Sequence, residues 1–178
     1  MKPRLVILSD LWGKQKSAWI TMYIENLQNT FDIQYYDCCE IGTIDTTIYS
    51  QENLHQQFTS FGIEKAVATL LNKEKEPFHL IAFSIGGTIA WKAALLGLPL
   101  ISLHAISATR LRYEVTIPTI DIVLYFGEED KYKPTKDWCE KFSNASIIFF
   151  EDELHEMYKR EKIAIVVCNN IKEGNQYI

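Results

Sequence analysis

The chain has 178 residues, of which 47% are hydrophobic and 23% are charged, and its formal net charge is −5. These values are typical of a soluble globular protein, and the length fits one domain, residues 1–178, with a normal core. No lysine and arginine cluster reaches the density of a nucleic-acid-binding face, so we expect no nucleic-acid partner. No apolar run approaches the ~20 residues that span a bilayer, so we expect no membrane-spanning segment.

Short apolar runs alternate along the chain with longer amphipathic segments. The predicted strands are Leu5–Leu8, Ile33–Tyr36, Leu80–Phe83, Leu100–His104, Asp121–Phe126 and Ile147–Phe150. Apolar residues at helical spacing indicate the helices. Pro134 is expected in the first turn of one helix, and Gly97 follows the last turn of another. The predicted helices are Ser17–Gln28, Gly62–Asn72, Thr88–Leu96, Pro134–Phe142 and about His155–Ile171. The polar, Thr-rich segment Gly42–Gln57 is expected to be a surface excursion.

This alternation predicts an α/β fold: a mostly parallel sheet of about six strands with helices on both faces. Several of the strands are apolar nearly throughout, as expected when both faces of a parallel sheet are covered. In such a sheet, functional side chains belong in the loops that follow the carboxyl ends of the strands. Candidate residues are therefore sought in those loops.

Ser84 follows the predicted strand Leu80–Phe83 and precedes a helix. Ala82 lies two residues before it and Gly86 two residues after it, close to the G-x-S-x-G pattern of a nucleophile elbow. Small flanking residues are needed there because the chain reverses sharply and a large side chain would collide across the turn. The turn presents the serine hydroxyl next to the positive end of a helix. A plain strand–helix turn without chemistry is the alternative.

A serine nucleophile needs a base and an acid that orients the base. Asp130 lies in the loop after Asp121–Phe126, with Glu128 or Asp152 as the next choices for the acid. His155 follows the last strand, and the acidic run before it, Glu151 to Glu153, either interacts with His155 or only solvates the loop. His104 is the one rival for the base, and a strand-end histidine satisfied by the backbone explains it better.

The order Ser84, Asp130, His155 resembles that of the α/β-hydrolase superfamily. The resemblance covers most of the chain and implies a serine nucleophile, an orienting acid and a histidine base at these positions. It also implies that the backbone N–H groups of Leu11 and Ile85 form the oxyanion hole. The chain departs from the family pattern at Ser9-Asp10, where many members have His-Gly. It departs again at Ala82, where the elbow usually has glycine, and at Leu154, where a small residue usually precedes the histidine.

Trp12, next to the predicted oxyanion loop, is a candidate substrate-binding residue. Arg110 and Arg112 lie between the fourth and fifth predicted strands, near the catalytic edge. They are either solvated surface charges or an anion handle for a substrate carboxylate or phosphate, or for an acidic carrier protein. The segment Ala105–Thr119 is too short for a helical cap, so an open site without a cap domain is expected.

The four cysteines, Cys38, Cys39, Cys139 and Cys168, lack the spacing of zinc ligands. The first apolar run is too short for a secretory signal. We therefore expect reduced thiols, a cytoplasmic location, and neither metal nor cofactor. The resemblance implies a serine esterase or thioesterase acting on a small-molecule or carrier-borne acyl group. An acyltransferase with the same triad and a non-catalytic binding protein of this fold are the alternatives, and the oligomeric state is open.

Overall fold

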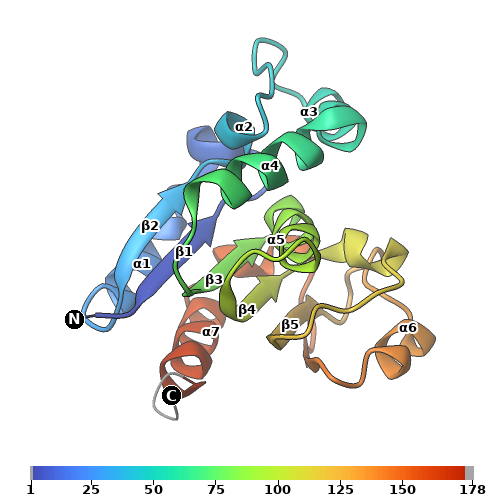
Figure 1. The fold of residues 1–178 in the computed structure, drawn as a ribbon. Coiled ribbons are helices and arrows are strands. Elements are labelled where there is room, and N and C mark those ends of the chain that lie inside the picture. The colour runs from blue at the N-terminus through green and yellow to red at the C-terminus, as the bar shows by residue number, and fades with distance from the viewer. Residues whose placement is uncertain (1, 175–178) are drawn as a thin grey trace.

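A computed structural model of the protein describes residues 2–174, so the domain predicted over 1–178 extends slightly beyond the described part. Its centre is a sheet of six strands in the order β2-β1-β3-β4-β5-β6, and every neighbouring pair is parallel (Figure 1). The strands are β1 (Arg4–Leu8), β2 (Asp32–Tyr36), β3 (Phe78–Phe83), β4 (Leu100–Ile106), β5 (Asp121–Gly127) and β6 (Ser146–Phe150). All six predicted strands are present, and the α/β sheet is confirmed.

Helices cover both faces of this sheet. The α-helices are α1 (Ile20–Leu27), α2 (Cys38–Ile41), α3 (Gln51–Gln57), α4 (Ile63–Lys73), α5 (Ile85–Leu95), α6 (Lys136–Lys141) and α7 (Glu161–Gly174). Short 3₁₀ helices are η1 (Gly13–Lys16), η3 (Thr109–Tyr113) and η4 (His155–Lys159), and the π-helical segment η2 (Phe58–Gly62) joins α3 to α4.

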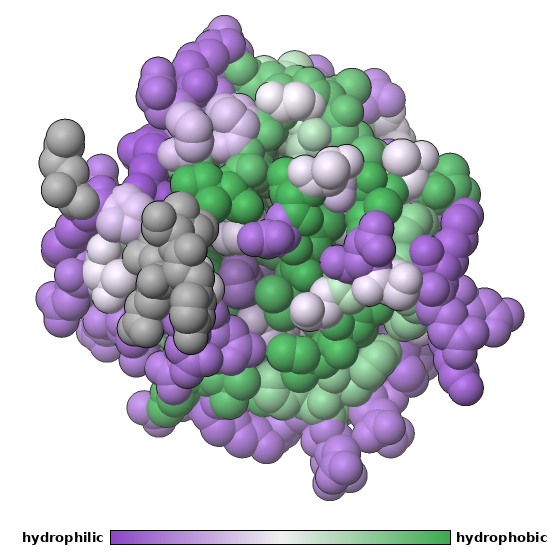
Figure 2. Space-filling model, turned by 60° about the horizontal axis from the view of Figure 1, so that its bottom comes forward, coloured by the Kyte–Doolittle hydropathy of each residue, from purple (hydrophilic) through white to green (hydrophobic). Residues whose placement is uncertain are grey.

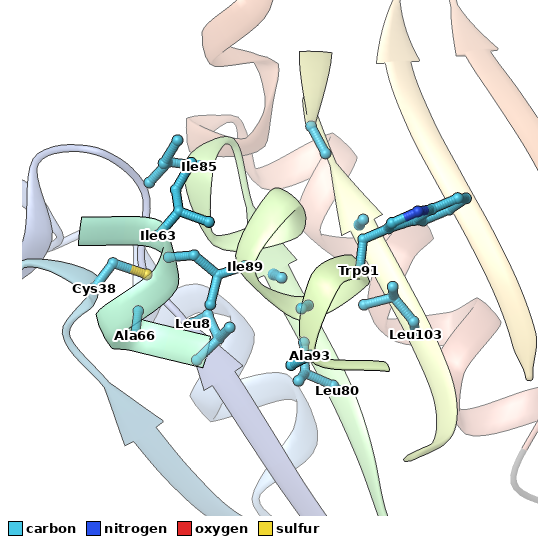
Figure 3. Packing of buried hydrophobic residues seen from close by; sticks show 14 of the residues in the cluster. Leu8, Cys38, Ile63, Ala66, Leu80, Ile85, Ile89, Trp91, Ala93 and Leu103 are labelled. Carbon is cyan, nitrogen blue, oxygen red and sulfur yellow. The ribbon is translucent and has the colours of Figure 1, made fainter. Parts of the chain in front are cut away.

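Two hydrophobic cores follow from the alternation of side chains along each strand. Leu80 and Ala82 of β3 enter the core that lies beneath α2 to α6. Ile81 and Phe83 enter the core that lies beneath α1, η4 and α7. Figure 3 shows part of the first core, where Ile85 and Ile89 of α5 meet side chains of α4 and β1. The packing of α5 fixes the start of that helix, where the predicted nucleophile lies.

Three predictions about the segments between the strands need correction. The segment 42–57 is not wholly irregular, because α3 occupies its second half, capped by the Ser50 hydroxyl, which accepts a hydrogen bond from Asn53 N–H. The predicted helix His155–Ile171 is divided into η4 and α7, with Arg160 extended between them. Helix α5 begins at Ile85, directly after Ser84, rather than at Thr88.

Some apolar side chains remain at the surface. Turned so that the bottom of Figure 1 comes forward, the molecule shows apolar residues in the middle of the face and polar residues around much of its margin (Figure 2). Exposed large apolar residues come from several elements, for example Leu96 after α5, Phe149 in β6 and Ile165 in α7. Within residues 2–174, no helix combines the length and the apolar character needed to cross a membrane.

Candidate active site

Ser84 occupies a strained turn between β3 and α5. Its φ is 50° and its ψ is −112°, outside the regions that most non-glycine residues adopt. Such a conformation costs about 1–3 kcal/mol and persists only where its surroundings enforce it. Here Ser84 N–H donates to the carbonyl of Ile106 at 2.8 Å, and Gly87 N–H donates to the Ser84 carbonyl at 3.1 Å. The backbone of this turn has the form expected of a nucleophile elbow.

Two glycines allow α5 to begin between the ends of β1 and β4. A Cβ added at Gly86 would lie 2.5 Å from the Ser9 carbonyl oxygen, closer than real Cβ atoms approach. A Cβ added at Gly87 would lie 2.4 Å from Cβ of Ala108, which follows β4. The small residue predicted at Gly86 is therefore required by a close approach of the first strand.

The three predicted triad residues form a hydrogen-bonded series in which His155 lies between Ser84 and Asp130. The Ser84 Oγ atom is 3.0 Å from His155 Nε2, and His155 Nδ1 is 2.7 Å from Asp130 Oδ2. The Asp130 side chain is 2% exposed, whereas 33% of the His155 side chain is exposed. The geometry thus joins a buried carboxylate, a partly exposed imidazole and a hydroxyl in one line.

The Asp130 carboxyl is stabilised in its ionised form. Burial opposes its ionisation, but hydrogen bonds from His155 and from Tyr132 N–H outweigh the burial, so the pKa of Asp130 is lowered. The alternative acids Glu128 and Asp152 are exposed, and neither has a hydrogen bond to His155 in the described part of the chain.

The loop that carries His155 is fixed by Glu153, whose role the sequence did not reveal. Glu153 is 2% exposed, and its Oε1 lies 3.1 Å from Arg160 and 2.6 Å from Lys162. Its carbonyl accepts a hydrogen bond from Glu129 N–H in the acid loop at 3.0 Å. The predicted acidic run therefore contains one buried anchor. Leu154 is 64% exposed, so a large residue before the histidine crowds nothing.

Leu11 and Ile85 offer two backbone donors near the serine. Neither N–H group has an acceptor among residues 2–174. Ile85 begins α5, and the first N–H groups of a helix have no partner within that helix. Both groups are thus available to an oxyanion, as the resemblance implies.

Asp10 holds the loop that contains Leu11. Its Oδ1 accepts a hydrogen bond from Trp12 N–H at 2.9 Å, and its Oδ2 accepts one from the Tyr158 hydroxyl at 3.0 Å. Burial raises the pKa of Asp10, although the hydrogen bonds from Trp12 and Tyr158 act in the opposite direction. Because Tyr158 lies in η4 with His155, this contact connects the oxyanion loop to the histidine segment.

His104 is not placed as expected. Strand β4 continues to Ile106, so His104 lies inside the strand, and its Nδ1 is 3.0 Å from the Tyr125 hydroxyl rather than bonded to backbone. Burial lowers the pKa of His104 to about 3, so the ring is neutral at physiological pH.

The three candidate substrate-binding residues differ in their surroundings. The Trp12 ring packs edge-on against Tyr49 and lines a cavity of about 190 Å³ whose lining includes no triad residue. Arg112 donates to the carbonyls of Thr109 and Tyr132, at 2.7 and 3.3 Å, and so supports the acid loop. Arg110 has no hydrogen-bonded partner in the described part of the chain.

Comparison with known proteins identifies the fold. No protein-family profile and no curated protein matches the sequence. A protein assigned to the α/β hydrolase superfamily from Xanthomonas campestris pv. campestris is 15% identical, with a TM-score of 0.72 over 97% of this chain and 99% of that chain. Alpha/beta hydrolase domain-containing protein 10 from mouse is 12% identical, with a TM-score of 0.70 over 100% of this chain and 92% of that chain.

A third similar structure is Est1E from Butyrivibrio proteoclasticus. It is 12% identical and has a TM-score of 0.65 over 97% of this chain and 88% of that chain. At such low identity these likenesses establish the architecture, which agrees with the strand order and with the turn at Ser84. The chain has the α/β-hydrolase fold.

Proposed function

We propose that this protein is a serine hydrolase that cleaves a carboxylic ester or thioester through an acyl-enzyme on Ser84. The observation that carries the proposal is the continuous line from Ser84 Oγ through the His155 ring to Asp130, at 3.0 and 2.7 Å. Similar structures support it, since they include carboxylesterases from Nitrososphaera gargenis. We further propose one catalytic domain without a cap, located in the cytoplasm, where its free cysteines stay reduced.

In the proposed mechanism, neutral His155 donates its Nδ1–H to Asp130 and accepts the Ser84 proton at Nε2. The Ser84 oxygen then attacks the acyl carbonyl and forms a tetrahedral intermediate. The N–H groups of Leu11 and Ile85 stabilise its oxyanion, and each such donor is worth about 10²–10³ in kcat. His155 protonates the leaving alcohol or thiol, and water attacks the acyl-enzyme with His155 again as base.

The departure of the oxyanion loop from His-Gly does not weaken this proposal. Asp10 replaces a small residue, but its carboxylate is occupied by Trp12 N–H and the Tyr158 hydroxyl. The Leu11 N–H remains without an acceptor among residues 2–174. This availability argues against the non-catalytic alternative.

The test is hydrolysis of a panel of p-nitrophenyl esters and acyl thioesters by purified protein. The wild type is expected to release product, Ser84→Ala is expected to lose the activity, and Ser143→Ala, which changes an exposed serine, is expected to keep it. Activity that survives in Ser84→Ala, or a folded wild type inactive on every ester and thioester, would contradict the proposal. Product formed only when an added alcohol accepts the acyl group would indicate the acyltransferase instead.

A further inference from the structure

We propose that the guanidinium of Arg110 binds an anionic group of the substrate, a carboxylate or a phosphate, so that the preferred ester carries a negative charge. This inference rests on the proposed hydrolase function and names its substrate class. Its basis is the unusual state of one arginine in the segment that follows β4.

Arg110 is the exception among the four arginines of the chain. Arg4 makes two hydrogen bonds to Glu74, at 2.9 and 2.8 Å, and Arg160 lies 3.1 Å from Glu153. Arg112 is held by two backbone carbonyls and the Tyr113 hydroxyl. Arg110 has no ion pair or hydrogen bond within residues 2–174, and its Nε is buried without a partner.

An unpaired buried donor needs an explanation because its desolvation is not repaid. Arg110 Nε is one of three such buried side-chain atoms in the described part of the chain, with Thr88 Oγ1 and Ser107 Oγ. Thr88 follows Gly87 in sequence, and Ser107 and Arg110 lie within two residues of Ala108; Gly87 and Ala108 are in contact where α5 begins beside the end of β4. The three buried atoms without partners thus belong to two segments, the start of α5 and the stretch after β4, that meet three residues after Ser84.

The position of Arg110 brings it within reach of a substrate on Ser84. Ala108 contacts Gly87, which is three residues after Ser84, and Arg110 is two residues after Ala108. From the dimensions of the chain, the Cα atom of Arg110 is within roughly 15 Å of Ser84. A long side chain and an acyl chain of moderate length can bridge that span.

No carboxylate among residues 2–174 forms an ion pair with Arg110. Its guanidinium carbon lies 5.3 Å from the centroid of the Tyr113 ring, a cation–π contact that holds the side chain without neutralising it. The nearby carboxylate of Glu114 is paired with Lys92 at 2.9 Å. The pKa of His55, which lies on α3, is lowered mainly by burial and then by the charges of Arg110 and Arg112. The positive potential of the two arginines therefore extends as far as α3.

A small anionic group fits these facts better than the surface of an acidic protein. A protein surface would be met by exposed, flexible cations, whereas the Nε of Arg110 is buried. Arginine offers a planar pair of donors that suits the two oxygens of a carboxylate or phosphate. The chemistry therefore assigns Arg110 to the substrate itself.

The test compares Arg110→Met with wild type on p-nitrophenyl monoesters of dicarboxylic acids and on p-nitrophenyl esters of the matching monocarboxylic acids. For the anionic esters we expect kcat/KM to fall about 10- to 100-fold, the loss typical of a charge-assisted hydrogen bond. The neutral esters are expected to change less than about 2-fold. Lys73→Met, which removes an exposed cation at the end of α4, is the matched control and should leave both classes unchanged.

A second measurement separates this inference from the proposed hydrolysis. Calorimetric binding of the same esters to Ser84→Ala should be tighter for the anionic esters, and this preference should vanish in Ser84→Ala/Arg110→Met. If wild type hydrolyses no ester, the proposed function fails while the calorimetry still decides the role of Arg110. Equal losses for both ester classes, no loss at all, or a loss confined to acyl groups on an acidic carrier protein would each overturn the assignment.

Discussion

Gly86→Ala is expected to impair catalysis without touching the triad. The added Cβ would lie 2.5 Å from the Ser9 carbonyl oxygen and 3.0 Å from Cβ of Leu8. Ordinary contact at such a position begins at 3.4 Å, so α5 and the end of β1 must separate by roughly 1 Å. Overpacking of this kind costs about 1–3 kcal/mol in the free energy of unfolding.

The displacement falls on the oxyanion loop, because Ser9 leads directly into Asp10 and Leu11. A donor moved by about 1 Å loses most of its effect on the oxyanion, so kcat should fall about 10²-fold. The assay is p-nitrophenyl ester hydrolysis, paired with urea unfolding of the same preparation. Gly174→Ala is the control, since an added Cβ there meets no atom of residues 2–174 within 4 Å. A Gly86→Ala protein that is less stable but has wild-type kcat would refute the coupling of this contact to the oxyanion loop.

Two further changes probe the hydrogen bonds of the site. In Asp130→Asn, kcat should fall about 10³–10⁴-fold, because the neutral amide no longer stabilises the imidazolium that forms on His155. Ester hydrolysis kinetics at neutral pH measure this loss. Since the folded-state pKa of Asp130 is lowered, its stabilising contribution is present above the unfolded pKa and lost as pH falls through the folded value. In urea unfolding, the difference in unfolding free energy between wild type and Asp130→Asn should therefore shrink as the pH falls into the acid range. A difference that grows there would contradict the assignment. Tyr158→Phe leaves Asp10 Oδ2 without its donor and should cost about 1–3 kcal/mol of unfolding free energy, whereas Tyr132→Phe, at an exposed tyrosine, should cost almost nothing.

Local patterns in the sequence predicted the sheet and indicated the loops in which to look for a triad. The strands β1 and β3 are largely apolar runs, because helices cover both faces of the sheet there. Ser84, Asp130 and His155 could be proposed because each follows a strand, and the carboxyl ends of parallel strands share one edge. These predictions needed only the residues on either side of each candidate.

The features that the sequence did not reveal depend on contacts between distant segments. Asp10 and Tyr158 are 148 residues apart, and nothing near either one indicates the other. Glu153 looks like its exposed neighbours until the fold brings Arg160 and Lys162 to it. Helix α3 was missed because its sequence is polar and buries only Leu54.

Covalent labelling with a fluorophosphonate probe tests the central claim most directly, because the probe reacts with an activated serine and needs no knowledge of the substrate. Peptide mass analysis is expected to find one adduct, on Ser84, in the folded wild type. Labelling should be absent in Ser84→Ala and strongly slowed in His155→Ala, with circular dichroism confirming that both variants are folded. A folded wild type that resists the probe, or a Ser84→Ala protein labelled as fast as wild type, would contradict the account.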